Sequence, residues 1–366
     1  MTKGSPVFFA AVAFLFVSAS AYGRQHLSGH LPPEIAERPI LGAVPAAQAL
    51  RLVIGLPARN QAGLDSFLRN VYNPASPDYH HFLSPDEFLD RFGPSAGDYQ
   101  AVAAFAKSNH LTITAIHHDR RLLEARGSAV DVERVFHVGL VRRQRSDGSE
   151  FYSTDAEPSV DLDVPLQYVS GLDNFSRIRP ALRLAGPHLG GPGGAAPGVS
   201  GTGPGGDYMG DDIRDAYCNG VSAALDGSGQ SIGLLEFDTF YPSDIASYEQ
   251  NADPALPANT AIAVPLDGDT ASTKPGTDNV EVALDIEMAV SMAPGSTVYV
   301  YEGPNTPAAA DILLDAMANN TPLCGQLSAS WTGYGDGNTS AILEQFAAQG
   351  QSFFSAAGDD GAYGSK

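Results

Sequence analysis

The sequence predicts an α/β protein of two domains, in which a small α+β domain precedes a larger domain built on a parallel sheet. Three observations support this prediction. A length of 366 residues suits about two domains at roughly 150 residues each. The elements predicted over 48–155 follow an order that favours a mainly antiparallel sheet. Over 231–356 they become near-continuous apolar strands separated by helices, the pattern of a parallel sheet covered on both faces.

Charge divides the chain into two unlike parts. Residues 1–200 hold 19 acidic and 18 basic side chains, whereas residues 201–366 hold 23 acidic and 3 basic ones. A net charge of −21 argues against nucleic acid or an anionic membrane as partner, because both would repel the chain. The hydrophobic content of 43% excludes a wholly disordered protein.

The first residues have the composition of a secretory signal peptide. A lysine precedes the apolar run Val7–Val17, and Ala19–Ala21 offers a small-residue cleavage site. The run is short of the roughly 20 residues that span a bilayer, and an uncleaved anchor is the alternative. We therefore expect a secreted protein, extracellular or periplasmic, in which a disulfide bond between Cys218 and Cys324 is permitted.

In the first domain the predicted elements follow from periodicity and capping signals. Ser84, Pro85 and Glu87 have the spacing of a capping box and predict the start of a helix. The expected elements are a strand over 50–56, helices over 61–71, 84–92 and 96–108, strands over 111–116 and 121–125, a helix over 130–136, and strands over 138–142 and 150–153.

Residues 186–206 are predicted to form a linker. Glycine occupies 10 of these 21 positions and none is Asp, Glu, Lys or Arg, so the segment cannot bury a core. The chain is thus divided into a signal peptide over 1–23, a first domain over 24–185, the linker over 186–206 and a second domain over 207–366.

In the second domain strands and helices alternate. The expected elements are strands over 231–237, 260–266, 297–301, 323–330 and 352–356, and helices over 243–251, 280–292, 308–319 and 340–349. Because ligands of such sheets bind at the carboxyl ends of the strands, we expect a site near Glu236, Trp331 and Asp359, which stand at three of these ends.

The helix over 280–292 carries the most informative pair of residues. Glu281 and Asp285 are four positions apart and therefore neighbours on one face. One interpretation is that Glu281 completes a capping box with Asp278. The other is that the two carboxyls are half-buried and share a proton, an arrangement used for acid–base chemistry. The spacing leaves both open.

Histidine is missing from the second domain, since all nine histidines lie at or before His188. A Ser-His-Asp hydrolase needs histidine to take the serine proton, so a base in this domain would have to be a carboxylate or come from the first domain. The histidine pairs at 80–81 and 117–118 lack the spacing of metal ligands, and we expect them to be structural or on the surface.

The chain resembles the sedolisins, the serine-carboxyl peptidases, and its first half resembles a kumamolisin-type activation propeptide. Several motifs carry the resemblance in the order of the family. They are 76–80 and 84–94 in the first half, then Glu236, Glu281–Glu287 with Ala293–Gly295, Ser328–Trp331 and Ser355–Asp359. The resemblance implies a subtilisin-like parallel sheet preceded by a ferredoxin-like propeptide domain.

The resemblance also implies a role for each site residue. Glu281 would be the general base and Asp285 its hydrogen-bonded partner, supported by Glu236 and Trp331. Asp359 would be a protonated acid that donates to the oxyanion of the tetrahedral intermediate. Because carboxyl pKa values lie near 4, these roles imply an acidic optimum for the hydrolysis of peptide bonds in proteins.

Two parts of the family pattern are expected outside these residues. The family's serine nucleophile lies in a Gly-Thr-Ser motif after the oxyanion aspartate, and its calcium loop lies there too. Ser200–Thr202 is in the linker, and Asn338–Ser340 precedes Asp359 and is better interpreted as a helix N-cap. We therefore expect this 366-residue chain to be inactive by itself, with no metal site. The alternative function is a non-catalytic inhibitor or folding aid of the propeptide type.

The propeptide is expected to dock on the second domain through opposite charges. Six arginines of the first domain would face this acidic partner, and acidification would weaken such pairs by neutralising carboxylates. They are Arg120, Arg121, Arg126, Arg142, Arg143 and Arg145. A solvated arginine face is the alternative.

Overall fold

The computed structural model describes residues 24–180, 182, 201–218, 221–222, 224–252, 255–258, 261–266 and 274–359. The predicted signal peptide lies outside the described residues, as does the predicted linker up to residue 200. Among the described helices, none has the length and apolar content needed to cross a membrane. We call residues 24–180 the N-terminal domain and residues 201–359 the second domain.

The N-terminal domain is built on a four-stranded antiparallel sheet in the order β4-β5-β3-β9. With helices between β3 and β4 and between β5 and β9, this is the βαββαβ order of a ferredoxin-like domain, as predicted. The elements are β3 (Ala49–Gly55), α2 (Gln61–Val71), α3 (Pro85–Phe92), α4 (Ala96–Ser108), β4 (Thr112–Ile116), β5 (Leu122–Ser128), α5 (Ala129–Phe136) and β9 (Tyr168–Ser170).

The capping box predicted before α3 is confirmed. Ser84 Oγ accepts from the backbone N–H of Glu87 at 3.2 Å, and Glu87 accepts from the backbone N–H of Ser84 at 2.8 Å. Because these two bonds satisfy donors that the helix itself cannot pair, the local sequence alone was enough to place this helix start.

The two strands predicted last in this domain were assigned to the wrong sheet. Strand β6 (Leu140–Gln144) lies between β2 (Ile40–Ala43) and β7 (Glu150–Thr154) and pairs with both in a separate three-stranded sheet. The strand that completes the main sheet is β9, which the sequence analysis missed because three residues are too few to show an alternating pattern. Short pieces complete the domain, namely β1 (Gln25–His26), α1 (Pro33–Ala36), β8 (Ser159–Val160) and β10 (Arg179–Pro180).

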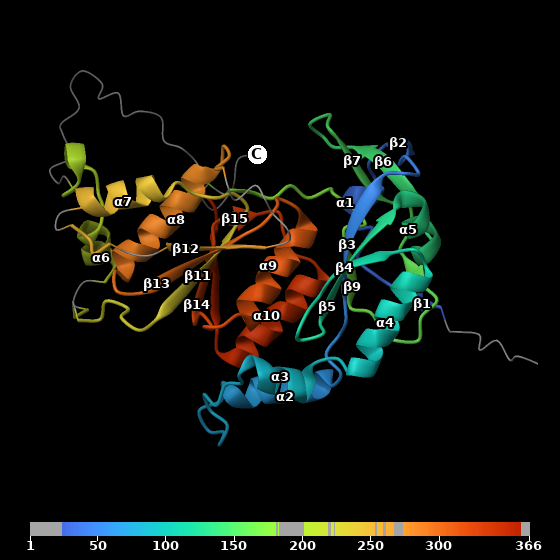
Figure 1. The fold of residues 1–366 in the computed structure, drawn as a ribbon, viewed down its shortest axis with the longest axis horizontal. Coiled ribbons are helices and arrows are strands. Elements are labelled where there is room, and N and C mark those ends of the chain that lie inside the picture. Colours follow the sequence, from blue (N-terminus) through green and yellow to red (C-terminus); the bar gives the residue numbers. More distant parts are fainter. Residues whose placement is uncertain are drawn as a thin grey trace, which may run out of the picture.

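The second domain contains a five-stranded parallel sheet in the order β12-β13-β11-β14-β16, which confirms the predicted class. Its strands are β11 (Ser231–Glu236), β12 (Ala261–Pro265), β13 (Thr297–Glu302), β14 (Gln326–Ala329) and β16 (Ser352–Ser355). Helix α8 (Asn279–Met292) covers one face with α6 (Asp211–Tyr217) and α7 (Pro242–Asn251), while α9 (Pro307–Asn319) and α10 (Gly337–Gln349) cover the other (Figure 1). A short 3-10 turn, Pro204–Gly206, precedes α6.

Helix α9 lies between the parallel sheet and the N-terminal domain, where it contacts β11 and β13 on one side and β3 on the other. Ten of its residues are buried, including Asp311 and Asp315. Since a solvent-facing helix keeps a polar side exposed, the burial of both carboxyls follows from the contact between domains.

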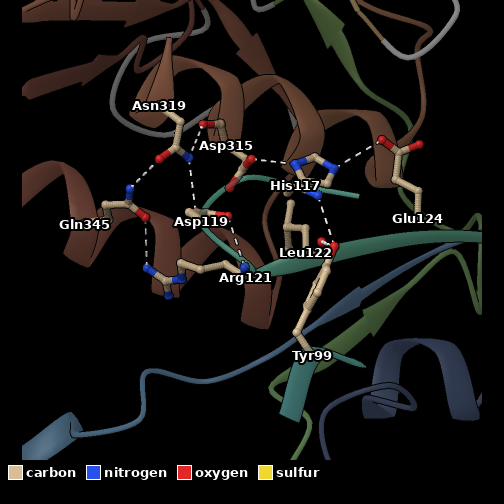
Figure 2. Close-up of polar contacts among 9 residues, drawn as sticks. All are labelled: Tyr99, His117, Asp119, Arg121, Leu122, Glu124, Asp315, Asn319 and Gln345. Carbon is tan, nitrogen blue, oxygen red and sulfur yellow. Dashed lines mark hydrogen bonds and ion pairs between the residues drawn. The ribbon is translucent and has the colours of Figure 1, made fainter. Parts of the chain in front are cut away.

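Three further contacts join the domains. Strand β10 pairs antiparallel with β15 (Trp331–Thr332), just after β14. Ala348 of α10 belongs to an apolar cluster whose other members come from the N-terminal domain, among them Leu64 and Phe88. The turn between β4 and β5 reaches α9, where His117 Nδ1 lies 2.6 Å from Asp315 Oδ2 and its Nε2 lies 3.2 Å from Glu124 (Figure 2).

The prediction that the arginines bind the second domain is wrong for four of the six. Arg142 pairs with Glu150, and carbonyls of the N-terminal domain accept from Arg120, Arg143 and Arg145. Arg121 does reach across, because its Nη1 donates to Gln345 Oε1 at 3.2 Å (Figure 2). The contact between the domains thus combines an apolar cluster with individual hydrogen bonds and the His117–Asp315 pair, which net charge could not indicate. His117 was expected to be structural or at the surface, and it is structural and partly buried, with 12% of its side chain exposed.

Candidate active site

Three acidic or polar side chains meet at the carboxyl end of the parallel sheet. Glu236 ends β11 beside Glu302, which ends β13 in the same register. Trp331 follows β14, the strand on the other side of β11. Because parallel strands end at the same edge, the sheet brings together residues that are 95 positions apart in the sequence.

Glu236 is fully buried and its partner is Trp331. The indole Nε1 donates to Glu236 Oε2 over 2.7 Å, and the indole is itself 1% exposed. Burial raises the pKa of Glu236 well above its usual range, and the neighbouring carboxyl of Asp285 raises it further. Glu236 therefore favours its protonated form in this structure.

Asp285 lies on α8 next to Glu236. Its Oδ1 accepts from Ser330 Oγ at 2.7 Å, and burial raises its pKa. Glu236 Oε1 and Asp285 Oδ2 are buried without a partner when both groups are counted as ionised. The two carboxyls are in hydrogen-bonding contact, so a shared proton would satisfy both groups.

Glu281 lies one turn before Asp285 and is 4% exposed. Burial, Asp285 and Asp359 together raise its pKa to about 7, and its Oε2 has no hydrogen-bond partner. Asp278 makes no side-chain cap at the start of α8, so the capping-box interpretation of Glu281 is wrong. The two carboxyls do lie close enough for Asp285 to raise the pKa of Glu281, but the hydrogen-bonding contact of Asp285 is with Glu236, so a proton shared between Glu281 and Asp285 stays a prediction.

Asp359 follows β16 and is exposed. Its charge acts on Glu281, so it lies on the same side of the sheet as the network. All five predicted site residues are therefore gathered at one edge. Their catalytic roles stay predictions, because position alone does not assign a proton transfer.

The sequence analysis gave no role to two members of this edge. Ser330 bonds to Asp285, and Glu302 accepts from Thr239 Oγ1 at 2.8 Å while only 1% exposed. Both occupy strand ends beside residues that were singled out, and this position was the signal that could have found them.

The two serine motifs set aside from the sequence have other partners. Thr202 Oγ1 donates to Asp212 at 2.8 Å, and Ser200 lies outside the described residues. Ser340 is in α10, where its hydroxyl donates to the carbonyl of Asp336. The N-cap of α10 is Asp336 rather than the predicted Asn338–Ser340 segment, since its carboxyl accepts from the N–H groups of Asn338 and Thr339.

The described residues do not fit a metal ion. They contain no group of three or more His, Cys, Asp or Glu side chains arranged to hold one, so no step is assigned to calcium. Cys218 and Cys324 are both free thiols in this structure, and Cys324 is buried.

Comparison with known proteins agrees with this architecture. Residues 40–175 match the family described as pro-kumamolisin, activation domain. Kumamolisin of Bacillus sp. (strain MN-32) is 28% identical over 356 residues, 92% of this chain and 62% of the relative. Sedolisin of Pseudomonas sp. (strain 101) is 31% identical over 141 residues, 38% of this chain and 24% of the relative. Xanthomonalisin of Xanthomonas sp. (strain T-22) is 26% identical over 350 residues, 88% of this chain and 40% of the relative.

The chain spans less than two thirds of the length of each of these three relatives. Among solved structures, fervidolysin from Fervidobacterium pennivorans, a keratinolytic enzyme related to subtilisin, matches at 11% identity and a TM-score of 0.34, over 90% of this chain and 43% of that one. That similarity is too low to bear on the fold. The sequence relatives and the matched activation domain show that the chain is similar to peptidases of the sedolisin type, and that its residues 40–175 resemble a pro-kumamolisin activation domain.

Proposed function

We propose that the chain is the precursor of a secreted serine-carboxyl endopeptidase that hydrolyses peptide bonds in proteins, with Glu281 as the general base. The observation that supports this most directly is the buried carboxyl network of Glu236, Asp285 and Glu281. A folded protein keeps such groups away from water only where their proton exchange or their packing is needed.

Each residue then has a chemical task. Glu281 accepts the proton of the attacking serine hydroxyl, and Asp285 takes part of that charge through the proton that it shares with Glu236. Trp331 orients Glu236 by its N–H bond. Asp359, while protonated, donates to the oxyanion that forms on the carbonyl oxygen of the scissile bond.

The nucleophile is assigned to none of the described serines. Ser330 is hydrogen-bonded to this network, but its hydroxyl donates to Asp285 rather than to Glu281. We propose that the 366-residue chain therefore does not hydrolyse peptides by itself, and that calcium binding, expected for the complete family domain, also needs other residues.

The acidic optimum requires a change at Glu281. With a pKa of about 7 in this structure, Glu281 is protonated at pH 4 and cannot act as a base. The proposed role of Glu281 as a base in acid therefore requires a lower pKa in the active form than in this structure. The acid limb of kcat/KM against pH reports this pKa in the free enzyme.

The test uses the full-length natural protein, assayed at pH 4 with an internally quenched peptide. Glu281→Gln should lower kcat about 1,000-fold with little change in KM, because a general base acts in the transition state. Glu287→Gln is the matched control on the same helix, since burial and Asp244 raise the pKa of Glu287 to about 7. It should stay within about twofold of the natural protein.

Equal activity of Glu281→Gln and Glu287→Gln would remove Glu281 from the mechanism. Hydrolysis by the 366-residue chain that disappears in Ser330→Ala would instead make Ser330 the nucleophile. Either result overturns an assignment made above.

The inhibitor function has one observation in its favour. Strand β10 pairs with β15, with Pro180 opposite Trp331, so the end of the N-terminal domain lies beside the network. The 366-residue chain, added to a complete sedolisin-type peptidase, should inhibit it if this is its function, and an unchanged rate would exclude it.

A further inference from the structure

A second group of carboxyls lies away from the sheet edge, where the two domains meet. Asp311 of α9 is 1% exposed, and Asp336 caps α10. Between them lies the hydroxyl of Ser170, which belongs to β9 of the N-terminal domain and is 3% exposed. We call these three residues the Asp–Ser–Asp cluster.

The hydrogen bonds of the cluster are complete. Ser170 Oγ contacts Asp311 Oδ2, and it lies 2.5 Å from Asp336 Oδ2. Asn338 Nδ2 donates to Ser170 Oγ at 3.0 Å and to Asp311 Oδ2 at 3.2 Å. Thr339 Oγ1 donates to Asp311 Oδ1 at 2.9 Å, and the remaining oxygen of Asp336 accepts the two backbone N–H groups of its helix cap.

These contacts fix the number of protons. A serine hydroxyl has one hydrogen to donate and two lone pairs to accept with. Ser170 can donate to only one of the two aspartates, so the other must be protonated and donate to Ser170. The Ser170 hydroxyl then donates its one hydrogen to one aspartate and accepts two hydrogen bonds, from the protonated aspartate and from Asn338. Its hydrogen-bonding capacity is full. Two ionised carboxylates would leave one contact without a hydrogen.

No positive charge compensates for ionisation here. In the described part of the chain, neither Asp311 nor Asp336 forms an ion pair with a lysine, arginine or histidine. The groups that face them from β9 and its flanks are the Tyr168 phenol and the Asp173 carboxyl, and Arg145 acts on Asp173 instead. Burial and Asp336 raise the pKa of Asp311 well above its usual range, and burial raises that of Asp336.

His30 is a further titratable group of this interface, and β3 also faces the cluster. His30 stacks on Tyr168 at 3.9 Å, and burial lowers its pKa to about 4, so it is neutral above that pH. From β3, the facing groups are backbone, with the carbonyl of Val53 lying 3.5 Å from Asn338 Nδ2. The cluster therefore carries at most one negative charge when the domains are in contact.

We propose that the contact between the two domains takes up one proton at the Asp–Ser–Asp cluster, so that the contact strengthens as the pH falls and weakens as it rises. When the domains separate, Ser170 leaves and both aspartates meet water, where each ionises near pH 4. An aspartate whose pKa is raised while the domains are in contact stabilises that contact fully below about pH 4, its pKa in water. This stabilisation is lost as the pH rises through the raised pKa.

This sign is opposite to the one expected from surface ion pairs, which acid weakens. Asp119, in the turn that reaches α9, changes the stability of the contact with pH in the same direction as the cluster, since burial and Asp315 raise its pKa to about 7. For His117, burial disfavours the charged form, but Asp315 and Glu124 outweigh it and raise the pKa to about 10. Its contribution is complete below pH 6.5 and is lost as the pH rises towards 10.

The experiment measures hydrogen exchange of the full chain between about pH 4.5 and 5.5, where His117 is charged in both states because even its ordinary pKa of about 6.5 lies above this range. The readout is the opening constant at β9 and the first turn of α10, corrected for the intrinsic exchange rate. Asp311→Asn replaces the acid by an amide that donates without a bound proton. The opening constant of the natural chain should rise more steeply with pH than that of Asp311→Asn, by up to about tenfold per pH unit.

Two controls make the result decisive. Glu344→Gln removes a carboxyl of α10 that bonds to Gln61 outside the cluster, and its slope should equal that of the natural chain. The infrared carbonyl band of a protonated acid at pH 6.5 should be smaller in Asp311→Asn than in the natural chain. Equal slopes and equal bands in both proteins would overturn the proposal.

Asp336→Asn provides the same test if Asp311→Asn does not fold, because asparagine also caps helices. If the opening constant of Asp336→Asn rises less steeply with pH than that of the natural chain, the bound proton is supported. If the two rise equally, the bound proton is contradicted. The proposal does not depend on the peptidase function. Hydrogen exchange and the infrared band can fail while Glu281→Gln still abolishes hydrolysis, and the reverse also holds.

Discussion

The second domain contributes to two clusters of carboxyl side chains, the Asp–Ser–Asp cluster and the cluster at the sheet edge. The two clusters differ in whether their carboxyl oxygens have hydrogen-bond partners. In the Asp–Ser–Asp cluster each oxygen of Asp311 and Asp336 has a hydrogen-bond partner. At the sheet edge, the carboxyls of Glu236 and Asp285 contact each other, whereas Oε2 of Glu281 is buried without a partner. Burial raises the pKa in both places. The difference teaches that a raised pKa does not by itself identify a catalytic group, and that Glu281, whose oxygen is left over at the sheet edge, is the better candidate to accept a proton.

The largest expected loss of stability comes from adding a side chain at Gly55, next to the Asp–Ser–Asp cluster. A Cβ at Gly55 of β3 would lie 1.7 Å from Asn338 Oδ1, and Asn338 is held by Ser170 and Asp311. Gly55→Ala should therefore lower the free energy of unfolding by about 3 kcal/mol, because the side chain in its way cannot turn aside freely. Denaturant unfolding of the full chain measures this.

Gly148→Ala is the control for Gly55→Ala. Gly148 has no heavy atom within 4 Å of an added Cβ, but its φ is +85°, so the change should cost only about 1 kcal/mol of backbone strain. If Gly55→Ala is no more destabilising than Gly148→Ala, the cluster is not rigid and the comparison between the two groups loses its basis.

The next effect sharpens the description of the sheet edge. Trp331→Phe removes the N–H donor to Glu236 and keeps an apolar ring. It should lower the free energy of unfolding by about 2 kcal/mol, since a buried carboxyl loses its partner. It should also raise the pKa of Glu236 further, because the indole bond lowers it. Calorimetry at several pH values measures both changes.

Phe237→Leu separates ring packing from the hydrogen bond. The Phe237 ring meets the indole edge to face with centroids 5.4 Å apart, and its loss should destabilise the chain without altering the titration of Glu236. Identical titration curves for Trp331→Phe and Phe237→Leu would show that the bond to Glu236 has no role in holding its proton.

The smallest expected effect concerns Asp336, which both caps α10 and contacts Ser170. Asp336→Ala removes both the helix cap and the contact with Ser170, and should lower the free energy of unfolding by about 1 kcal/mol more than Asp336→Asn, which keeps the cap. Thermal unfolding of both variants at pH 5 measures the difference. Equal midpoints would mean that the cap contributes nothing to stability there.

Several features could be predicted from the sequence because their signals are local. The capping box at Ser84 and the apolar strand that ends in Glu236 were placed by neighbouring residues alone. The paired carboxyls of α8 were recognised as a candidate, but their spacing could not decide between a cap and a shared proton. That choice depended on Asp285 meeting Glu236, which lies on a different strand.

Other features could not be predicted, for identifiable reasons. Strand β9 has three residues, too few for a periodic signal, yet it supplies Ser170 to the interface. Asp336 was missed as the cap of α10 because Asn338 also suits that role. The arginines were expected to bind across the domains because of net charge, although Arg143 and Arg145 satisfy carbonyls of their own domain.

The sequence by itself determined the order of elements, the parallel sheet and the residues at its carboxyl edge, since periodicity and turn signals act over a few residues. Only the tertiary structure decided which carboxyls hold protons. A pKa depends on burial and on neighbours brought from distant segments, as with Asp311, which becomes a buried acid only where β9 of the N-terminal domain covers α9.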